Sequence, residues 1–476
     1  MNPIPNIAKA DSYKYSHYLQ YRPGTEYVTS YIESRGCERD WTQVVNAGSV
    51  YLLESYLKQP LVTEKSLGRM KKRFPAHGPS FNREGWEDLL ALHNGMAPVR
   101  VQALPEGLVV PLGTPQLQIV NTDRRFPWLP SFMETHILRS IWYPSTVATL
   151  SFHIKQIIAK YMDETAGHRE GLDFKLHDFG SRGASSSESA QIGGLAHLYN
   201  FQGSDTYEAI ELAYELYGID MAAFSVDAAE HSTVTSFGGP EHELAAYEHL
   251  LETFGKGSNK IFSVVSDSYD LWNAVDNLWG DALKAKVEDL GTRNTKLVVR
   301  PDSGDPTRVP VETIQRLMDK FGHTINQKGY KVLPPYIGVL QGDGINEKSI
   351  EQILQNMKEV GLSAENIVFG MGGELLQKVN RDTLNYAMKA SGAKGSFNNG
   401  EWYDVFKDPV TDSGKRSKKG RLAVVKRGGE IVTIRESELG RGEENLLQDI
   451  YKNGYGAGDA SGVTLPQVRE RINAAL

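Results

Sequence analysis

Residues 225–238 read SVDAAEHSTVTSFG, with His231 at their centre. A short apolar run, residues 221–224, precedes this stretch, so we expect His231 just beyond a β-strand. An imidazole can act as a base, a metal ligand or a phosphate-accepting nucleophile. A loop histidine that only forms local hydrogen bonds is the alternative for this residue in isolation. The sequence on either side decides between them, because similar units recur along the chain.

Each recurring unit is a short apolar run followed by a polar loop. The six polar loops are residues 177–183, 227–233, 266–270, 300–304, 341–344 and 370–373. Helical patterns follow several of them; Val311, Ile314, Leu317 and Phe321, for example, fall on one face before Gly322. Strands and helices that alternate in this way predict parallel strands joined by right-handed crossovers. The polar loops are then expected to gather at one end of the sheet, where such folds hold their active sites.

The chain is expected to be an α/β protein with three parts. Residues 1–150 read as a mixed α+β domain. Residues 151–388 predict an irregular (β/α) barrel, favoured over an open sheet because the first polar loop carries no GxGxxG motif. Residues 389–476 contain a cationic run at 415–421 and a hairpin pattern at 422–434. We expect this last part to pack on the N-terminal domain.

Composition restricts the class of protein. The 476 residues carry a net charge of −7 with a pI of about 6.0, which argues against a dedicated nucleic-acid binder. Cys37 is the only cysteine, which excludes an internal disulfide and a multi-cysteine zinc site and suits a reducing compartment. Residues 1–14 lack the apolar core of a signal peptide, and no uninterrupted apolar run reaches about 18 residues. We therefore expect a cytoplasmic protein that does not cross a membrane.

The polar loops contain groups suited to phosphate, ribose and an aromatic ring. Arg300 can bind two phosphate oxygens, and Asp302 suits a sugar diol or a magnesium ion carried by a diphosphate. Phe179 and Arg182 place an aromatic face beside a cation. The alternatives are an Arg300–Asp302 ion pair that fixes a loop, core packing for Phe179, and helix N-capping for Asp205. Together these groups indicate glycosyl transfer from a sugar diphosphate or phosphoryl chemistry, without deciding between the two.

Glycines and cations supply further candidates for phosphate binding. The turns at residues 341–344 and 372–373 have backbone N–H groups that can hold phosphate or ribose oxygens. The alternative is that their glycines serve only the turns. The cationic run at 415–421 is either a solvated loop or a flap over polyphosphate.

The order of these motifs resembles the nicotinamide phosphoribosyltransferase family, which belongs to the type II phosphoribosyltransferases. The matching segments are residues 11–14, 176–183, 228–233, 264–270, 300–304, 341–344, 375–378, 406–410 and 415–422. The resemblance implies an irregular (β/α) barrel and a mixed domain built from the N- and C-terminal segments. It also implies transfer of phosphoribosyl from phosphoribosyl pyrophosphate to nicotinamide, giving nicotinamide mononucleotide and pyrophosphate in NAD salvage.

The resemblance further implies roles for individual residues. His231 corresponds to a histidine that ATP phosphorylates, which couples ATP hydrolysis to transfer, and Asp267 to a carboxylate near this histidine and magnesium. Phe179 corresponds to the residue that stacks on one face of the pyridine ring. Tyr13 corresponds to the residue that covers the other face from the second subunit of a homodimer. Asp205 corresponds to the acceptor of the carboxamide N–H.

The remaining implied roles concern phosphates and ribose. Arg182 and Arg300 correspond to phosphate or ring contacts, and Arg300 and Asp302 are expected to act in catalysis. The ribose side is assigned to Asp302, Gly342 and Asp343, the 5′-phosphate side to Gly372, Gly373 and Arg381, and the diphosphate or ATP phosphates to Arg35, Lys389 and Lys415. Magnesium is expected to accompany the diphosphate, held by Asp267 and Asp302 directly or through water.

Three residues depart from the family pattern. Asp227 stands where relatives commonly have proline, and Glu374 follows Gly373 where a small residue is expected. Gly338 replaces a larger residue of the animal enzymes, which is expected to widen an access path. None of the three coincides with a residue to which a role is assigned above.

Three alternative functions remain open. A nicotinate phosphoribosyltransferase would have to place a carboxylate beside Asp205, and like charges ~4 Å apart cost on the order of 4 kcal/mol at an effective dielectric of ~20. A non-catalytic nucleotide-binding relative is disfavoured by the intact His231, Arg300 and Asp302. An aldolase-type barrel would need a Schiff-base lysine at a strand end, and none of the six polar loops contains a lysine.

Overall fold

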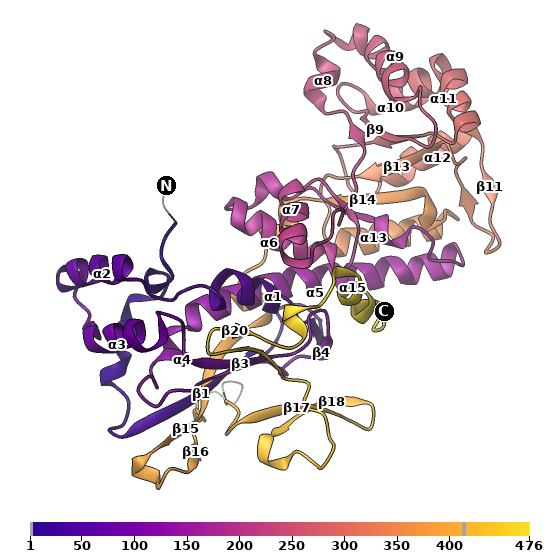
Figure 1. The fold of residues 1–476 in the computed structure, drawn as a ribbon. Helices are drawn as coiled ribbons and strands as arrows, with labels where there is room; N and C mark the ends of the chain where they lie inside the picture. Colours follow the sequence, from indigo (N-terminus) through magenta and orange to yellow (C-terminus); the bar gives the residue numbers. More distant parts are fainter. Residues whose placement is uncertain (1–2, 412–415) are drawn as a thin grey trace. The chain divides into compact units, whose positions relative to one another are not determined.

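The computed structural model describes residues 3–411 and 416–476, and the chain forms two compact units (Figure 1). Unit 1 comprises Met1–Thr149, Ala213–Ile219 and Asn380–Ala475, and unit 2 comprises Leu150–Leu212, Asp220–Val379 and Leu476. Within the described residues, no helix is both long and apolar enough to cross a bilayer.

Unit 1 is built on a seven-stranded antiparallel sheet in the order β16-β15-β1-β5-β3-β19-β20. Its strands are β1 (Thr25–Ser34), β3 (Val99–Ala103), β5 (Pro115–Asn121), β15 (Tyr386–Gly395), β16 (Trp402–Asp404), β19 (Gln448–Lys452) and β20 (Tyr455–Gly456). Two smaller ladders are β2 (Gln43–Val45) with β4 (Val109–Pro111), and β17 (Leu422–Arg427) with β18 (Glu430–Arg435). Strands from the two ends of the sequence therefore share one sheet, and the expected hairpin near the C-terminus is confirmed.

Unit 1 also contains several short helices. They are η2 (Ser12–Leu19), α1 (Ser49–Leu52), α2 (Glu64–His77), α3 (Arg83–His93), α4 (Leu129–Phe132) and α15 (Leu465–Asn473). Thr63 forms a capping box with Ser66 at the start of α2, and Leu67, Met70 and Phe74 form its buried face. The long helix α5 (Glu134–Thr165) begins in unit 1 and ends in unit 2.

Unit 2 contains a parallel sheet in the order β7-β6-β14-β13-β10-β9-β8. The strands are β6 (Leu176–Asp178), β7 (Gly203–Ser204), β8 (Asp227–Ala228), β9 (Ile261–Val265), β10 (Lys296–Arg300), β13 (Ile337–Gln341) and β14 (Ile367–Met371). Their apolar residues are buried as a nearly continuous run; Val264, Leu297 and Phe369 are fully buried. The parallel arrangement that the sequence predicts is confirmed.

A short segment, residues 224–228, closes this sheet into an irregular barrel. Phe224 forms a parallel bridge to Gly203 of β7 at one edge. Three residues later, Asp227 and Ala228 pair with Phe262 and Ser263 of β9 at the other edge. The predicted barrel is thereby confirmed, although the strand expected before His231 is reduced to a single bridge at Phe224 and the two residues of β8.

Helices follow the strands of unit 2. They are α6 (Ser187–Leu198), α7 (Tyr207–Tyr217), α8 (His231–Thr235), α9 (Glu243–Phe254), α10 (Leu271–Asn273), η7 (Ala274–Ala282), α11 (Lys284–Leu290), α12 (Val309–Phe321), α13 (Glu347–Glu359) and α14 (Gly373–Leu376). The predicted apolar face of α12 is buried. Gly322 then ends the helix with φ of 79°, and its N–H donates to Met318 O at 2.8 Å.

Candidate active site

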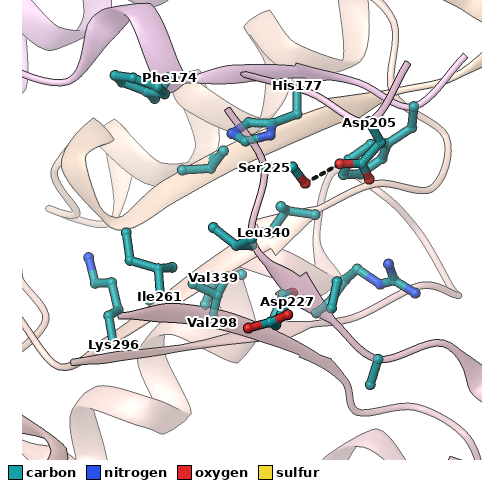
Figure 2. Close-up of a pocket in the computed structure, with 18 of the residues that line it drawn as sticks. Phe174, His177, Asp205, Ser225, Asp227, Ile261, Lys296, Val298, Val339 and Leu340 are labelled. Carbon is teal, nitrogen blue, oxygen red and sulfur yellow. Dashed lines mark hydrogen bonds between the residues drawn. The ribbon is translucent and has the colours of Figure 1, made fainter. Parts of the chain in front are cut away.

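Unit 2 contains a cavity of about 1240 Å³, lined by inward-facing strand residues and by the loops after the strands. Its wall includes His177 of β6, Val298 of β10 and Leu340 of β13 (Figure 2). The sequence-predicted residues that line it are Phe179, Arg182, Asp205, His231, Arg300 and Asp302. Loops from separate strands therefore share one cavity, as the parallel topology predicts.

Phe179 follows β6, and a glycine in the adjacent strand leaves room for its ring. A Cβ atom on Gly370 of β14 would lie 2.0 Å from Phe179 Cε2. The backbone N–H of Phe179 donates to Met371 O at 2.9 Å. A Cβ atom on Gly342 would lie 3.6 Å from Phe179 Cε2 and 3.7 Å from Asp302 Oδ1. Gly342 therefore lies between the aromatic ring and the carboxylate, where the residues assigned to pyridine and ribose adjoin.

Asp205 follows β7, and its carboxylate accepts a hydrogen bond from the Ser225 hydroxyl (Figure 2). Its backbone N–H donates to the main-chain oxygen of Asp178 at 2.9 Å. Asp178 is fully buried, and its Oδ1 accepts the N–H of Gly180 at 2.7 Å. Burial raises the pKa of Asp178 to about 6, against the effect of hydrogen bonds such as that from the N–H of Gly180. Asp178 thus anchors both loops that carry the predicted ring-binding residues.

His231 is the first residue of α8, and two carboxylates face its ring. Nε2 lies 3.0 Å from Asp267 Oδ1, and Nδ1 lies 3.9 Å from Asp302 Oδ2. The His231 side chain is 46% exposed, whereas that of Asp267 is only 4% exposed. A buried carboxylate that accepts from Nε2–H leaves the lone pair of a neutral imidazole on Nδ1, the nitrogen nearer to Asp302. The ring is therefore arranged as an accessible nucleophile with a buried orienting partner.

Arg300 and Asp302 extend this cluster from the end of β10. The backbone N–H of Asp302 donates to Asp267 Oδ2 at 3.1 Å. Burial raises the pKa of Asp302, and the Arg300 charge opposes this effect. The guanidinium is 3.9 Å from the Asp302 carboxylate, and Arg300 Nε is buried without a hydrogen-bond partner among the described residues. A buried donor of this kind indicates an anionic ligand more than an ion pair that merely fixes a loop.

Two glycine-containing loops lie together on the predicted phosphate side. Arg182 is exposed on the loop after β6, and a Cβ atom on Gly183 would lie 3.4 Å from Gly373 Cα. Glu374, one of the departures from the family pattern, forms an ion pair with Lys378 four residues later. The carboxylate of Glu374 therefore has a cationic partner beside the predicted 5′-phosphate loop.

Four predicted residues belong to the described part of unit 1, where three of them form a basic cluster. Burial lowers the pKa of Lys389, and the charges of Arg35, Lys407 and Arg381 act in the same direction. Arg35 Nε also donates to the main-chain oxygen of residue 385 at 3.4 Å. Tyr13 is 57% exposed on η2. The neighbouring cations thus lower the pKa of Lys389. Positive charge concentrated in this way suits the binding of an anionic ligand such as a polyphosphate.

Two further sequence-predicted residues are Lys415 and Asp343. Lys415 lies outside the described residues. Asp343 is exposed on the loop after β13, where Gln341 Nε2 donates to its main-chain oxygen at 2.9 Å.

The two carboxylates predicted to hold magnesium differ in their availability. Both oxygens of Asp267 already accept hydrogen bonds, from His231 and from the N–H of Asp302. The Asp302 carboxylate is 29% exposed and faces the cavity. Among the described residues, no three His, Cys, Asp or Glu side chains are grouped as metal ligands. This arrangement fits a magnesium ion that arrives with a diphosphate and meets Asp302 directly or through water.

Sequence reasoning missed three residues of this site, namely His177, Asp178 and Ser225. His177 is mostly buried on the cavity wall, and burial lowers its pKa. The position of Asp178 directly before Phe179 at a strand end was an available signal. Ser225 had none, because its contact with Asp205 arises only when the barrel closes.

Two solved structures share this fold over almost the whole chain. Nicotinate-nucleotide pyrophosphorylase from Pyrococcus furiosus aligns with a TM-score of 0.61 and 17% identity, covering 98% of this chain and 94% of that one. Human nicotinic acid phosphoribosyltransferase aligns with a TM-score of 0.60 and 17% identity, covering 97% and 91%. The fold is that of the type II phosphoribosyltransferases, a class of α/β enzymes.

Sequence comparison narrows this class to a family. Residues 174–455 match the nicotinate phosphoribosyltransferase family, and residues 6–101 match the nicotinamide phosphoribosyltransferase N-terminal domain. A nicotinamide phosphoribosyltransferase of Xanthomonas campestris is 42% identical over 98% of each chain. Another, of Acinetobacter baylyi, is 32% identical over 100% of this chain and 98% of its own. The chain therefore belongs to the nicotinate phosphoribosyltransferase family and is a pentosyltransferase.

Proposed function

We propose that this enzyme transfers the phosphoribosyl group of phosphoribosyl pyrophosphate to nicotinamide, forming nicotinamide mononucleotide and pyrophosphate for NAD salvage. One observation carries the choice of base: the Asp205 carboxylate lines the cavity beside the loop of Phe179. A carboxylate accepts an N–H from a carboxamide and repels the carboxylate of nicotinate. The curated relatives from Xanthomonas campestris and Acinetobacter baylyi, both nicotinamide phosphoribosyltransferases by name, support the same substrate.

The site residues suit the transfer step. Phe179 positions the pyridine ring of nicotinamide. The ring nitrogen attacks the anomeric carbon of the ribose as the bond from that carbon to pyrophosphate breaks. The ribose carbon gains positive charge in the transition state, which the nearby Asp302 carboxylate stabilises. The guanidinium of Arg300, whose Nε has no hydrogen-bond partner among the described residues, meets the departing phosphate oxygens. Magnesium, when bound with the diphosphate, neutralises part of the charge on the leaving group.

The histidine supports coupling to ATP. We propose that His231 Nδ1 attacks the γ-phosphorus of ATP, forming phosphohistidine and releasing ADP. Asp267 accepts the hydrogen bond from Nε2–H and stabilises the positive charge that develops on the imidazole ring. Water later hydrolyses the phosphohistidine to inorganic phosphate and regenerates the imidazole. The phosphorylated side chain, next to Arg300 and Asp302, would tighten the diphosphate site in the meantime.

We further propose a homodimer with shared active sites. The support is the exposure of Tyr13 and the basic residues Arg35 and Lys389 of unit 1, which the family resemblance assigns to a site shared between subunits. Analytical ultracentrifugation would measure the assembly. A monomer with full activity would reject this arrangement.

Product analysis tests the main proposal. Purified enzyme with phosphoribosyl pyrophosphate and magnesium is given nicotinamide or nicotinate, with and without ATP, and the nucleotide products are separated by chromatography. We expect nicotinamide mononucleotide, a higher rate with ATP, and a kcat/KM for nicotinamide well above that for nicotinate. Equal kcat/KM values would reject the preference for nicotinamide, a higher value for nicotinate would favour the nicotinate activity, and absence of both products would favour a non-catalytic nucleotide-binding relative.

A further inference from the structure

Ser225 lies one residue after the point at which the barrel closes. The N–H of Phe224 donates to Gln202 O at 2.8 Å, and the N–H of Ser204 donates to Phe224 O at 3.1 Å. The main-chain N–H and C=O of Phe224 are thus both hydrogen-bonded to residues 202–204, which contain β7. Ser225 and Asp205 each follow these bonds directly, so backbone pairing sets the distance between them.

Asp205 is held in place on its own side as well. Its N–H donates to Asp178 O at 2.9 Å, and the next N–H, of Thr206, donates to Ser204 Oγ at 3.0 Å. Neither bond involves the carboxylate. The one hydrogen bond that the Asp205 carboxylate makes among the described residues comes from the Ser225 hydroxyl, which donates to Oδ1 (Figure 2).

This arrangement leaves the two carboxylate oxygens of Asp205 in different environments. Oδ1 accepts the one hydrogen bond that the Ser225 hydroxyl can donate. Oδ2 is left for a ligand in the cavity. A terminal carboxylate torsion is otherwise broad, so an unrestrained Asp205 would have to be ordered each time a carboxamide binds. A hydrogen bond already formed in the free enzyme removes that cost.

We propose that Ser225 is a positioning residue that fixes Asp205 for recognition of the carboxamide and thereby contributes to the selection of nicotinamide over nicotinate. The inference rests on the proposed function and deepens it, because it assigns part of the base specificity to the segment that closes the barrel. Ser225 acts through Asp205, and the chemical step itself does not require it.

The test compares Ser225→Ala with Ser225→Thr, which keeps the hydroxyl. For Ser225→Ala we expect the KM for nicotinamide to rise about tenfold with kcat changed less than about threefold, because orientation of a binding group is lost. The ratio of kcat/KM for nicotinamide to that for nicotinate should fall about tenfold, and Ser225→Thr should restore both to within about threefold. Ser225 is exposed, so both variants are expected to fold, and their thermal midpoints check this.

A double-mutant cycle shows whether Ser225 acts through Asp205. In an Asp205→Ala background, Ser225→Ala should cause no further loss. An equal loss in both backgrounds, or unchanged nicotinamide kinetics in Ser225→Ala alone, would overturn the inference. If instead the wild-type enzyme shows no preference for nicotinamide, the proposed function fails before Ser225 is considered, so the two failures are distinguishable.

Discussion

Nε2 of His231 lies 3.0 Å from Oδ1 of Asp267, and the histidine is half-exposed while the carboxylate is buried. The same carboxylate accepts the N–H of Asp302 through its other oxygen. Asp267 therefore connects the predicted phosphate acceptor with the loop that carries Arg300 and Asp302. A change of charge at His231 is therefore expected to affect, through Asp267, the residues assigned to ribose and diphosphate.

Removing the imidazole should separate ATP coupling from transfer. We expect His231→Ala to lose stimulation by ATP and to bind phosphoribosyl pyrophosphate more weakly, yet to retain basal synthesis of nicotinamide mononucleotide. Asp267→Asn should slow labelling of the protein by γ-labelled ATP by about tenfold to a hundredfold, as expected for the loss of a hydrogen bond to a charged group. Equal labelling of wild type and His231→Ala would reject phosphohistidine formation.

The carboxylate of Asp205 should account for much of the discrimination between bases. Asp205→Ser removes the negative charge and keeps a group that can accept an N–H. We expect the ratio of kcat/KM for nicotinamide to that for nicotinate to fall by on the order of a hundredfold, since like charges in a cavity cost several kcal/mol. Competition between the two bases at one enzyme concentration measures this ratio. An unchanged ratio would place the selection elsewhere.

Space for the Phe179 ring depends on Gly370. In Gly370→Ala the new Cβ would lie 2.0 Å from Phe179 Cε2, so the ring must move. We expect the KM for nicotinamide to rise by about tenfold or more and the unfolding free energy to fall by about 1–3 kcal/mol, as for other overpacked sites. Gly68→Ala is the matched control, because a Cβ at position 68 meets nothing within 4 Å. Unchanged nicotinamide kinetics in Gly370→Ala would show that the ring does not need its present position.

Much of unit 2 could be predicted because its five-residue apolar strands leave a clear signal. The strands β9, β10, β13 and β14 coincide with the predicted apolar runs. The segment that closes the barrel could not be predicted in detail, because β7 and β8 have only two residues each, too few for any periodicity. The contact of Ser225 with Asp205 follows from that closure, which explains why loop residues such as Phe179 and Asp302 were found and Ser225 was missed.

Asp178 is the group whose ionisation we expect to affect stability near neutral pH. Its folded-state pKa is raised to about 6 by burial, above the value of about 3.9 for an unfolded aspartate. The folded protein then binds this proton more tightly than the unfolded chain does. Stability from this group is complete below about pH 4 and is lost as the pH rises to about 6.

Asp178→Asn should remove this part of the pH dependence, because an amide resembles the protonated carboxyl group and does not titrate. Relative to wild type, the variant should therefore gain unfolding free energy as the pH rises from about 4 to 6, by an amount on the order of 3 kcal/mol. Urea unfolding at several pH values measures the difference, and Asp319→Asn, at an exposed position of α12, controls for the loss of an acidic side chain. A difference between variant and wild type that stays constant over this pH range would mean that Asp178 keeps an ordinary pKa in the folded protein. In that case the hydrogen bonds from the loops of Phe179 and Asp205 outweigh its burial.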